Sequence, residues 1–295
     1  MTPHGSFMIL VQPLGKTSVT LAIAAVLAGC GGPKSRAVSM QAPTELLSRV
    51  TTDEWRHLAS LRIAFGHQSV GYDIVAGLED VARGFPQAKL NVIESAAGST
   101  AVGLVHFRAG QNELPMTKVD AFVRFIDGSR DAAPQIALLK FCYVDVTPAT
   151  DVRAVFSYYR DALADLRRRY PATSFVHVTM PLQTVQSGWK ASVKNLLGRP
   201  IGGHADNLKR HEYNELLRAQ YGGSEPIFDL AAIESTRPNG SRVLFSTGGR
   251  TAFGLAPDYT HDGGHLNEVG RSYVAAHLLL AFAEAAKPRR PDKKS

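Results

Sequence analysis

Residues 61–84, LRIAFGHQSVGYDIVAGLEDVARG, join a short apolar run to an amphipathic stretch through a polar turn. The run Leu61–Phe65 predicts a buried strand. Apolar residues then recur at helical spacing as far as Gly84, at Val70, Ile74, Leu78 and Val81. A strand that leads directly into a helix is the first half of a βαβ unit. This stretch therefore predicts a parallel sheet that is covered by helices.

The rest of the chain repeats the same alternation. Further strands are predicted over residues 90–94, 135–143, 175–179 and 226–230, and helices over residues 150–170, 207–221 and 267–286. The run 135–143 is apolar apart from Lys140, which is typical of a strand covered on both faces. We expect one α/β domain over residues 46–286 with a mainly parallel sheet.

The charge of the chain is concentrated near its end. The 295 residues carry a formal charge of +7, of which the predicted basic tail, residues 287–295, contributes +4. Lys16 contributes another positive charge, so the predicted domain is close to neutral. A basic groove for nucleic acid is therefore not expected. With 44% hydrophobic residues and only 2 cysteines, the chain is also unlike disordered and disulfide-stapled proteins.

The first residues resemble an export signal. Residues 17–29, TSVTLAIAAVLAG, are apolar, follow Lys16 and end in small residues, which predicts a signal peptide over residues 1–29. Together with Cys30 the end of this run resembles a bacterial lipobox, and this implies that Cys30 is acylated and anchors the mature chain to a membrane. Residues 30–45 then form a lipidated tether. Gly31 implies the outer membrane of the cell envelope, facing the periplasm.

Two polar segments carry the candidate chemistry. Ser69 occupies the predicted turn between strand and helix, at the edge where open α/β sheets bind ligands. Asp262 and His265 are three residues apart in a loop before the last helix, an arrangement in which the acid orients an imidazole base. Two alternatives remain open: Ser69 simply caps the helix, or His261 joins Asp262 and His265 at a metal ion.

These residues resemble the SGNH/GDSL hydrolases, which are serine esterases with a flavodoxin-like three-layer α/β/α fold. Residues 67–70, HQSV, fall where that family has Gly-Asp-Ser-Leu, residues 91–100 resemble its second block, and residues 262–270, DGGHLNEVG, resemble its last block. The resemblance implies Ser69 as the nucleophile, His265 as the general base and Asp262 as its orienting acid. It also implies the N–H groups of Ser69 and Gly98 as oxyanion donors.

The third block departs from the family pattern. The run PQIALLKFCYVDV, residues 134–146, aligns Val144 with the oxyanion asparagine and Asp145 with the acid. Valine cannot donate a hydrogen bond, and the loss of one oxyanion donor typically costs about 10²–10³ in rate. The candidates for a replacement donor are Tyr143, Gln68 and His67, and Asp145 is a further candidate for contact with the substrate.

The sequence thus predicts a serine esterase that acts on a small acyl group, such as acetyl, of a carbohydrate or another cell-envelope substrate. An O-acyltransferase with the same three residues is an alternative, and so is an inactive glycan-binding lipoprotein. An α/β-hydrolase fold is not favoured, because its nucleophile lies in a Gly-x-Ser-x-Gly elbow and His67 stands at the first glycine. No metal or organic cofactor is implied, and the sequence does not specify an oligomeric state.

Overall fold

A computed structural model describes residues 43–287. Within them, six strands form one parallel sheet in the order β2-β3-β1-β4-β5-β6. The strands are β1 (Arg62–His67), β2 (Val92–Glu94), β3 (Gly103–Arg108), β4 (Ile136–Leu139), β5 (Ser174–Val178) and β6 (Ile227–Phe228). A separate antiparallel hairpin contains β7 (Leu244–Thr247) and β8 (Arg250–Phe253).

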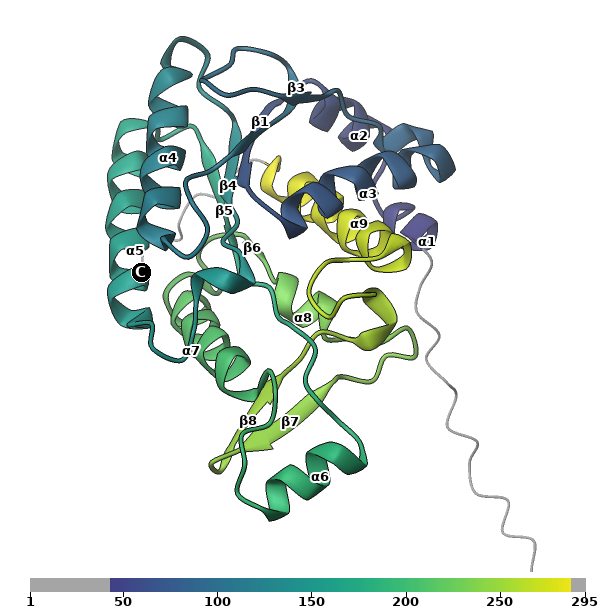
Figure 1. Ribbon diagram of the computed structural model, residues 1–295. Helices are drawn as coiled ribbons and strands as arrows, with labels where there is room; N and C mark the ends of the chain where they lie inside the picture. Colours follow the sequence, from purple (N-terminus) through teal and green to yellow (C-terminus); the bar gives the residue numbers. More distant parts are fainter. Residues whose placement is uncertain (1–42, 288–295) are drawn as a thin grey trace, which may run out of the picture. The chain divides into compact units, whose positions relative to one another are not determined.

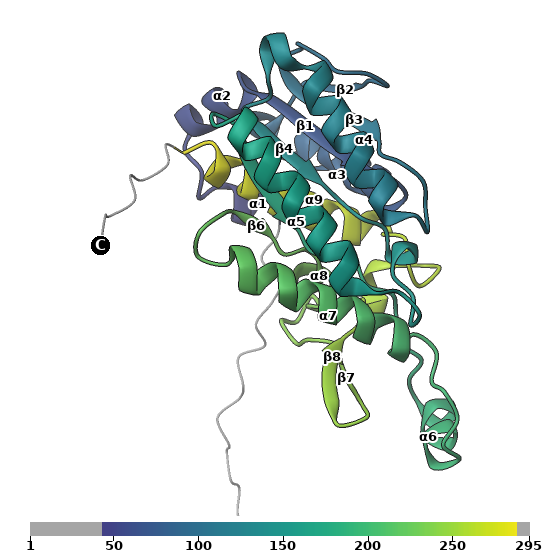
Figure 2. The same cartoon turned by 90° about the vertical axis from the view of Figure 1, so that its left-hand side faces the viewer.

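Helices cover both faces of the sheet (Figures 1 and 2). One face carries α1 (Pro43–Leu47), α2 (Thr52–Ala59), α3 (Val70–Gly84), α8 (Leu230–Glu234) and α9 (Glu268–Ala285). The other face carries α4 (Pro115–Gly128), α5 (Val152–Arg169) and α7 (His204–Tyr221). Each layer has its own apolar core against the sheet. The predicted three-layer α/β fold with a mainly parallel sheet is therefore confirmed.

The remaining elements are short. They are η1 (Pro86–Ala88), η2 (Arg130–Ala132), η3 (Tyr143–Asp145), α6 (Trp189–Leu196) and η4 (Pro257–Tyr259). Residues 43–287 contain no helix whose length and hydropathy would let it cross a bilayer. The predicted signal peptide, Cys30 and most of the basic tail lie outside the described residues. α1 begins at Pro43, so the last residues of the predicted tether, 43–45, lie in this helix.

All five predicted strands are present, and the sheet contains a sixth. β3 and α4 were not expected, and β3 is the strand that pairs with β1 on the side opposite β4. The predicted strand 135–143 also ends early, at Leu139, and its last residues turn into η3. After β1, the chain adds β2 and β3 on one side of β1, and β4 then pairs with β1 on its other side. The carboxyl ends of β1, β3 and β4 therefore meet at a topological switch point, where such sheets bind ligands.

The close approach of α3 and α9 depends on Gly77. A Cβ atom at this position would lie 2.3 Å from the backbone oxygen of Arg271 in α9 and 3.0 Å from the Cβ of Ala275. α3 begins directly after Ser69, and α9 begins directly after the loop that contains His265. The packing of these two helices consequently sets the distance between Ser69 and His265.

We expect Gly77→Ala to destabilise the protein by about 1–3 kcal/mol, because a backbone carbonyl cannot move aside as a flexible side chain can. Urea unfolding measures the change. Gly84→Ala is the matched control, since a Cβ there meets only the Thr44 Cγ2 at 3.9 Å. Equal stabilities for Gly77→Ala and the unmodified chain would contradict this account of the α3–α9 contact.

Candidate active site

Ser69 has a strained backbone and a side chain that does not cap α3. Its φ and ψ are 52° and −118°, which a residue with a Cβ rarely adopts. It stands at the N-cap position of α3, yet its side chain makes no capping hydrogen bond. The hydroxyl instead lies 2.7 Å from the Nε2 of His265. The alternative in which Ser69 serves only as a helix cap is therefore wrong.

The loop before α9 holds His265 in one orientation. The Nδ1 of His265 lies 2.7 Å from Asp262 Oδ2, and Asp262 Oδ1 accepts hydrogen bonds from the N–H groups of Gly264 and His265 at 2.9 and 2.8 Å. The Gly264 N–H and the His265 contacts hold the pKa of Asp262 well below its usual range. A carboxylate at Nδ1 requires a proton there, which leaves Nε2 to accept the hydrogen bond from the Ser69 hydroxyl.

The metal alternative does not match this geometry. His261 faces Glu268, with 3.5 Å between its Nε2 and Oε2 of that residue, while Asp262 faces His265. Among residues 43–287 no group of three or more His, Cys, Asp or Glu side chains is placed to hold a metal ion.

Asp73, in the first turn of α3, ties the histidine loop to the serine helix. Its carboxylate accepts a hydrogen bond from the N–H of Leu266 at 3.1 Å, across 193 positions of sequence. Burial raises the pKa of Asp73, although the bond from Leu266 acts in the opposite direction. Sequence reasoning missed this residue, because an acid in the first turn of a helix is usually explained by the helix dipole.

Gln68 and His67 are not available as oxyanion donors. The Nε2 of Gln68 donates both of its protons, to the carbonyls of Ala109 at 2.8 Å and Gly110 at 2.7 Å. His67 is fully buried beneath α3, with its Nε2 3.1 Å from the Nδ1 of His106. Burial lowers the pKa of His67 to about 2, so its ring is neutral. The expected contact of either side chain with substrate is wrong, because both are used to pack the turn.

Asp145 also points inward. Its carboxylate forms an ion pair with Lys118 at 2.6 Å and accepts hydrogen bonds from the N–H groups of Cys142 at 2.6 Å and Glu113 at 3.0 Å. The side chains of both Lys118 and Asp145 are 0% exposed. The expected substrate contact of Asp145 is therefore wrong, since this acid joins the β3–α4 loop to the β4–α5 loop.

Gly98 lies toward the amino ends of the strands, whereas Ser69 follows the carboxyl end of β1. A Cβ at Gly98 would lie 2.1 Å from the backbone of Gly128 at the end of α4, and the neighbouring Ser99 N–H donates to Ser129. The predicted role of Gly98 as an oxyanion donor is wrong because the sequence alignment overlooked β3. The loop that follows β3, and not the one that follows β2, runs beside Ser69.

Tyr143, another of the expected replacement donors, lies beside His265. Its half-buried ring packs against Gly264 and stands edge-on to the His265 ring, with 5.9 Å between the centroids. Burial raises the pKa of its hydroxyl. Arg210 fixes its backbone by donating from Nε to the Tyr143 carbonyl at 2.9 Å. The neighbouring Cys142 has a buried, free thiol that donates to the Gln68 carbonyl at 3.4 Å.

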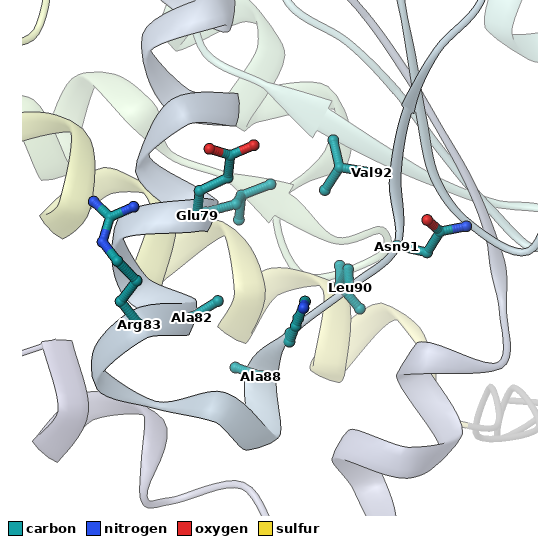
Figure 3. Close-up of a pocket in the computed structure, with 9 residues that line it drawn as sticks. Glu79, Ala82, Arg83, Ala88, Leu90, Asn91 and Val92 are labelled. Carbon is teal, nitrogen blue, oxygen red and sulfur yellow. The ribbon is translucent and has the colours of Figure 1, made fainter.

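A surface cavity of about 660 Å³ lies away from these residues (Figure 3). α3 contributes Glu79 and Arg83 to its wall, and the segment entering β2 contributes Leu90 and Val92. None of Ser69, Asp262 and His265 lines it. The candidate site is instead an open arrangement at the carboxyl edge of the sheet, with 44% of the His265 side chain and 56% of the Asp262 side chain exposed.

The comparisons with known proteins give similarities of structure only. No family model matches the chain, and no curated protein matches it. The chain is similar to a Streptococcus pneumonia protein described as a platelet activating factor (15% identity, TM-score 0.44, 80% of this chain and 91% of the other). It is also similar to an acetyl esterase crystallised with acetate, with 9% identity and a TM-score of 0.42 over 76% of this chain and 96% of the other. A third similar structure is the periplasmic domain of a lipopolysaccharide acetyltransferase from Salmonella ser. Paratyphi A. Its identity is 11% and its TM-score 0.41, over 81% of this chain and 88% of the other.

Glu234 makes the stability of the fold sensitive to pH. Burial raises its pKa to about 8, although the N–H of Leu182 donates to its carboxyl group. The unfolded chain releases this proton near pH 4.5, whereas the folded chain retains it until about pH 8. The contribution of Glu234 to stability therefore decreases as the pH rises across this interval.

We expect Glu234→Gln to remove this pH dependence. The melting temperature of the unmodified chain, relative to that of the variant, should fall between about pH 5 and pH 8. Scanning calorimetry at several pH values measures both curves. Parallel curves would show that folding does not raise the pKa of Glu234.

Proposed function

We propose that this chain is a divergent serine hydrolase of the SGNH/GDSL type that cleaves ester bonds. The observation that supports this most directly is the pair of 2.7 Å contacts, Ser69 Oγ to His265 Nε2 and His265 Nδ1 to Asp262 Oδ2. The strained backbone of Ser69 adds to it, because such strain persists where a function requires it.

The first half-reaction forms an acyl-enzyme. The Ser69 oxygen attacks the ester carbonyl, its proton moves to His265 Nε2, and the carbonyl electron pair moves onto oxygen. Asp262 stabilises the imidazolium that forms. The N–H groups of Ser69 and Gly110 make no hydrogen bond to another described residue, so both are available to the oxyanion. Collapse of the intermediate expels the alcohol, which takes the proton from His265.

The second half-reaction releases the acyl group. His265 removes a proton from water, the resulting hydroxide attacks the acyl carbon, and Ser69 leaves with the proton that His265 returns. An alcohol in place of water would give acyl transfer. The two activities share the acyl-enzyme and differ only in the acceptor.

The proposed substrate is a small acyl ester, such as an acetyl group on a carbohydrate or another envelope molecule. The exposure of the His265 and Asp262 side chains supports a large alcohol component, because solvent-exposed groups leave room for one. The proposed location is the cell envelope, with Cys30 as the lipid anchor and the domain in the periplasm. This part of the proposal rests on the sequence of residues 17–31.

An inactive glycan-binding protein is the second candidate. Val144 favours it, because the family resemblance implies an oxyanion asparagine there. The short contacts between Ser69, His265 and Asp262 favour the enzyme, since a binding protein has no need for an oriented base. Covalent labelling distinguishes the two candidates.

We expect the unmodified chain to react with a fluorophosphonate at Ser69 and to hydrolyse p-nitrophenyl acetate. Ser69→Ala should lose the label and at least about 10³-fold in kcat. Mass spectrometry locates the label, and Ser241→Ala is the control because this serine is exposed in the loop before β7. Hydrolysis that survives Ser69→Ala would exclude Ser69 as the nucleophile, and the absence of both label and hydrolysis would favour the binding protein.

A further inference from the structure

We propose that the side-chain amide of Asn112 is an oxyanion donor and replaces the one that Val144 lacks. This inference rests on the serine hydrolase function proposed above. Asn112 belongs to the loop between β3 and α4, two residues after Gly110, whose N–H makes no hydrogen bond to another described residue. The sequence did not identify this loop as part of the site, because β3 was not expected.

The orientation of the Asn112 amide follows from its partner. Lys118 donates from Nζ to Asn112 Oδ1 at 2.9 Å and to Asp145 Oδ2 at 2.6 Å. An ammonium group has no acceptor, so the amide oxygen must face Lys118 and the NH₂ group must face away from it. Asn112 is exposed, and its Nδ2 makes no hydrogen bond to another described residue. The buried ion pair of Lys118 and Asp145 thus holds the Asn112 amide with its NH₂ group directed outward.

A short chain of contacts joins Asn112 to the Ser69 turn. Gln68, the residue before Ser69, binds the Gly110 carbonyl at 2.7 Å, and Gly110 is two residues before Asn112. On the other side, Cys142 donates its thiol proton to the Gln68 carbonyl and its N–H to Asp145. Gln68, directly before Ser69, therefore contacts both the loop that bears Asn112 and the loop in which Val144 stands.

Backbone strain singles out the same place. Among residues 43–287, the non-glycine residues with positive φ are Ser69 at 52° and Glu113 at 68°. The N–H of Glu113 donates to Asp145 Oδ1 at 3.0 Å, so the buried carboxylate that pairs with Lys118 also holds the strained residue next to Asn112. Strained residues persist where the surrounding structure holds them for a function. Here they are the candidate nucleophile and the neighbour of the proposed donor.

The Asn112→Asp variant separates a donor from a structural residue. An aspartate has nearly the same shape and still accepts the hydrogen bond from Lys118, but when ionised it has no proton to donate. If Asn112 is an oxyanion donor, both Asn112→Asp and Asn112→Ala should lower kcat about 10²–10³-fold with little change in KM. If its role is structural, Asn112→Asp should keep the activity.

Binding of a tetrahedral analogue gives a second readout. An alkyl boronic acid forms an adduct with Ser69 in which an oxygen occupies the position of the oxyanion. The inhibition constant should rise in each variant by about the same factor as kcat falls, because both report the transition-state geometry. Gln111→Ala is the matched control, since Gln111 is exposed in the same loop and its side chain makes no hydrogen bond to another described residue.

The outcomes are separable. Fluorophosphonate labelling of Ser69 in the unmodified chain, together with full kcat in Asn112→Asp and Asn112→Ala, would overturn the role of Asn112 and leave the hydrolase proposal intact. An unmodified chain that neither labels nor hydrolyses an ester would overturn both. Equal losses in Gln111→Ala and Asn112→Ala would also count against Asn112, because a disturbed loop would then explain them.

A different observation identifies a second surface. We infer that the segment 182–203, here called the arm, contacts the surface of an anionic bilayer. It contains α6, whose exposed apolar residues have exposed fractions of 73% at Trp189, 45% at Val193 and 86% at Leu196. These positions recur at helical spacing on one face, and Leu197 follows at 59%. Exposed Trp and Leu on a short helix are typical of an interfacial element.

The positive charge of the arm indicates that the surface it contacts is anionic. The arm contains Lys190, Lys194 and Arg199 and no acidic residue, although the domain as a whole is nearly neutral. Residues 235–257, which include the β7–β8 hairpin, likewise contain only basic charges. Val185 packs against Gly254, and both segments extend from the same end of the domain (Figures 1 and 2). An apolar face with basic neighbours fits anionic lipid headgroups over acyl chains better than it fits a soluble glycan.

The arm is connected to the candidate site. The N–H of Thr184 donates to the carbonyl of Gly263, in the loop that contains Asp262 and His265, at 2.9 Å. A bilayer bound by the arm would therefore lie near that loop, where envelope esters could reach Ser69.

Trp189 itself reports the contact. In the full chain with Trp55→Phe, we expect vesicles of phosphatidylglycerol and phosphatidylethanolamine to shift the Trp189 emission to shorter wavelength, and phosphatidylcholine vesicles to have little effect. Leu196→Ser with Leu197→Ser should abolish the shift. Lys194→Gln should weaken binding roughly fivefold. Val102→Ser, which changes an exposed apolar residue in the β2–β3 loop, is the control.

An emission maximum that no vesicle changes would overturn this inference. So would a shift of equal size with phosphatidylcholine, because charge would then play no part. A shift produced by a soluble acidic polysaccharide, without one from anionic vesicles, would assign the surface to a glycan instead.

Discussion

The contact between α3 and α9 is the constraint on which the candidate site depends. Ser69 belongs to the start of α3, and His265 belongs to the loop that leads into α9, so no local interaction could bring them together. Gly77 allows the two helices to approach closely enough for its Cα to pack against the Arg271 carbonyl. The Asp73–Leu266 hydrogen bond then fixes the histidine loop on the serine helix. Stability and site geometry are therefore two results of one packing contact.

The second support of the site is a buried ion pair. Lys118 and Asp145 are removed from water, which costs several kcal/mol for each ion unless hydrogen bonds compensate. The cost is offset here by contacts to Asn112, Cys142 and Glu113. A pair of apolar residues would fill the same volume but could not hold two loops in a fixed relation beside Ser69. The pair thus serves the geometry of the carboxyl edge of the sheet.

The misplacement of Gly98 beside Ser69 has one origin, the missed strand β3. β3 is as long as β1, but its sequence, GLVHFR, begins with a glycine, contains His106 and ends with Arg108, so its apolar run is brief. Without β3, the glycine of the preceding loop, Gly98, was placed beside Ser69, and the loop that contains Gly110 and Asn112 was overlooked. A signal was available in α4, where Lys118 falls on the same helical face as Phe122 and Phe125. A lysine among apolar positions indicates a buried charge with a specific partner.

The sequence by itself determined the alternation of strands and helices, the polar turn at Ser69 and the Asp262–His265 spacing. These are local features, set by apolar periodicity and by the short reach of one turn. Only the tertiary structure decided that Ser69 faces His265 and that Gln68, His67 and Asp145 turn inward. It also revealed β3, whose loop to α4 contacts the side chain of Gln68, the residue before Ser69. The physical reason is that strand order and helix packing are set by contacts between residues far apart in the chain, which no local pattern records.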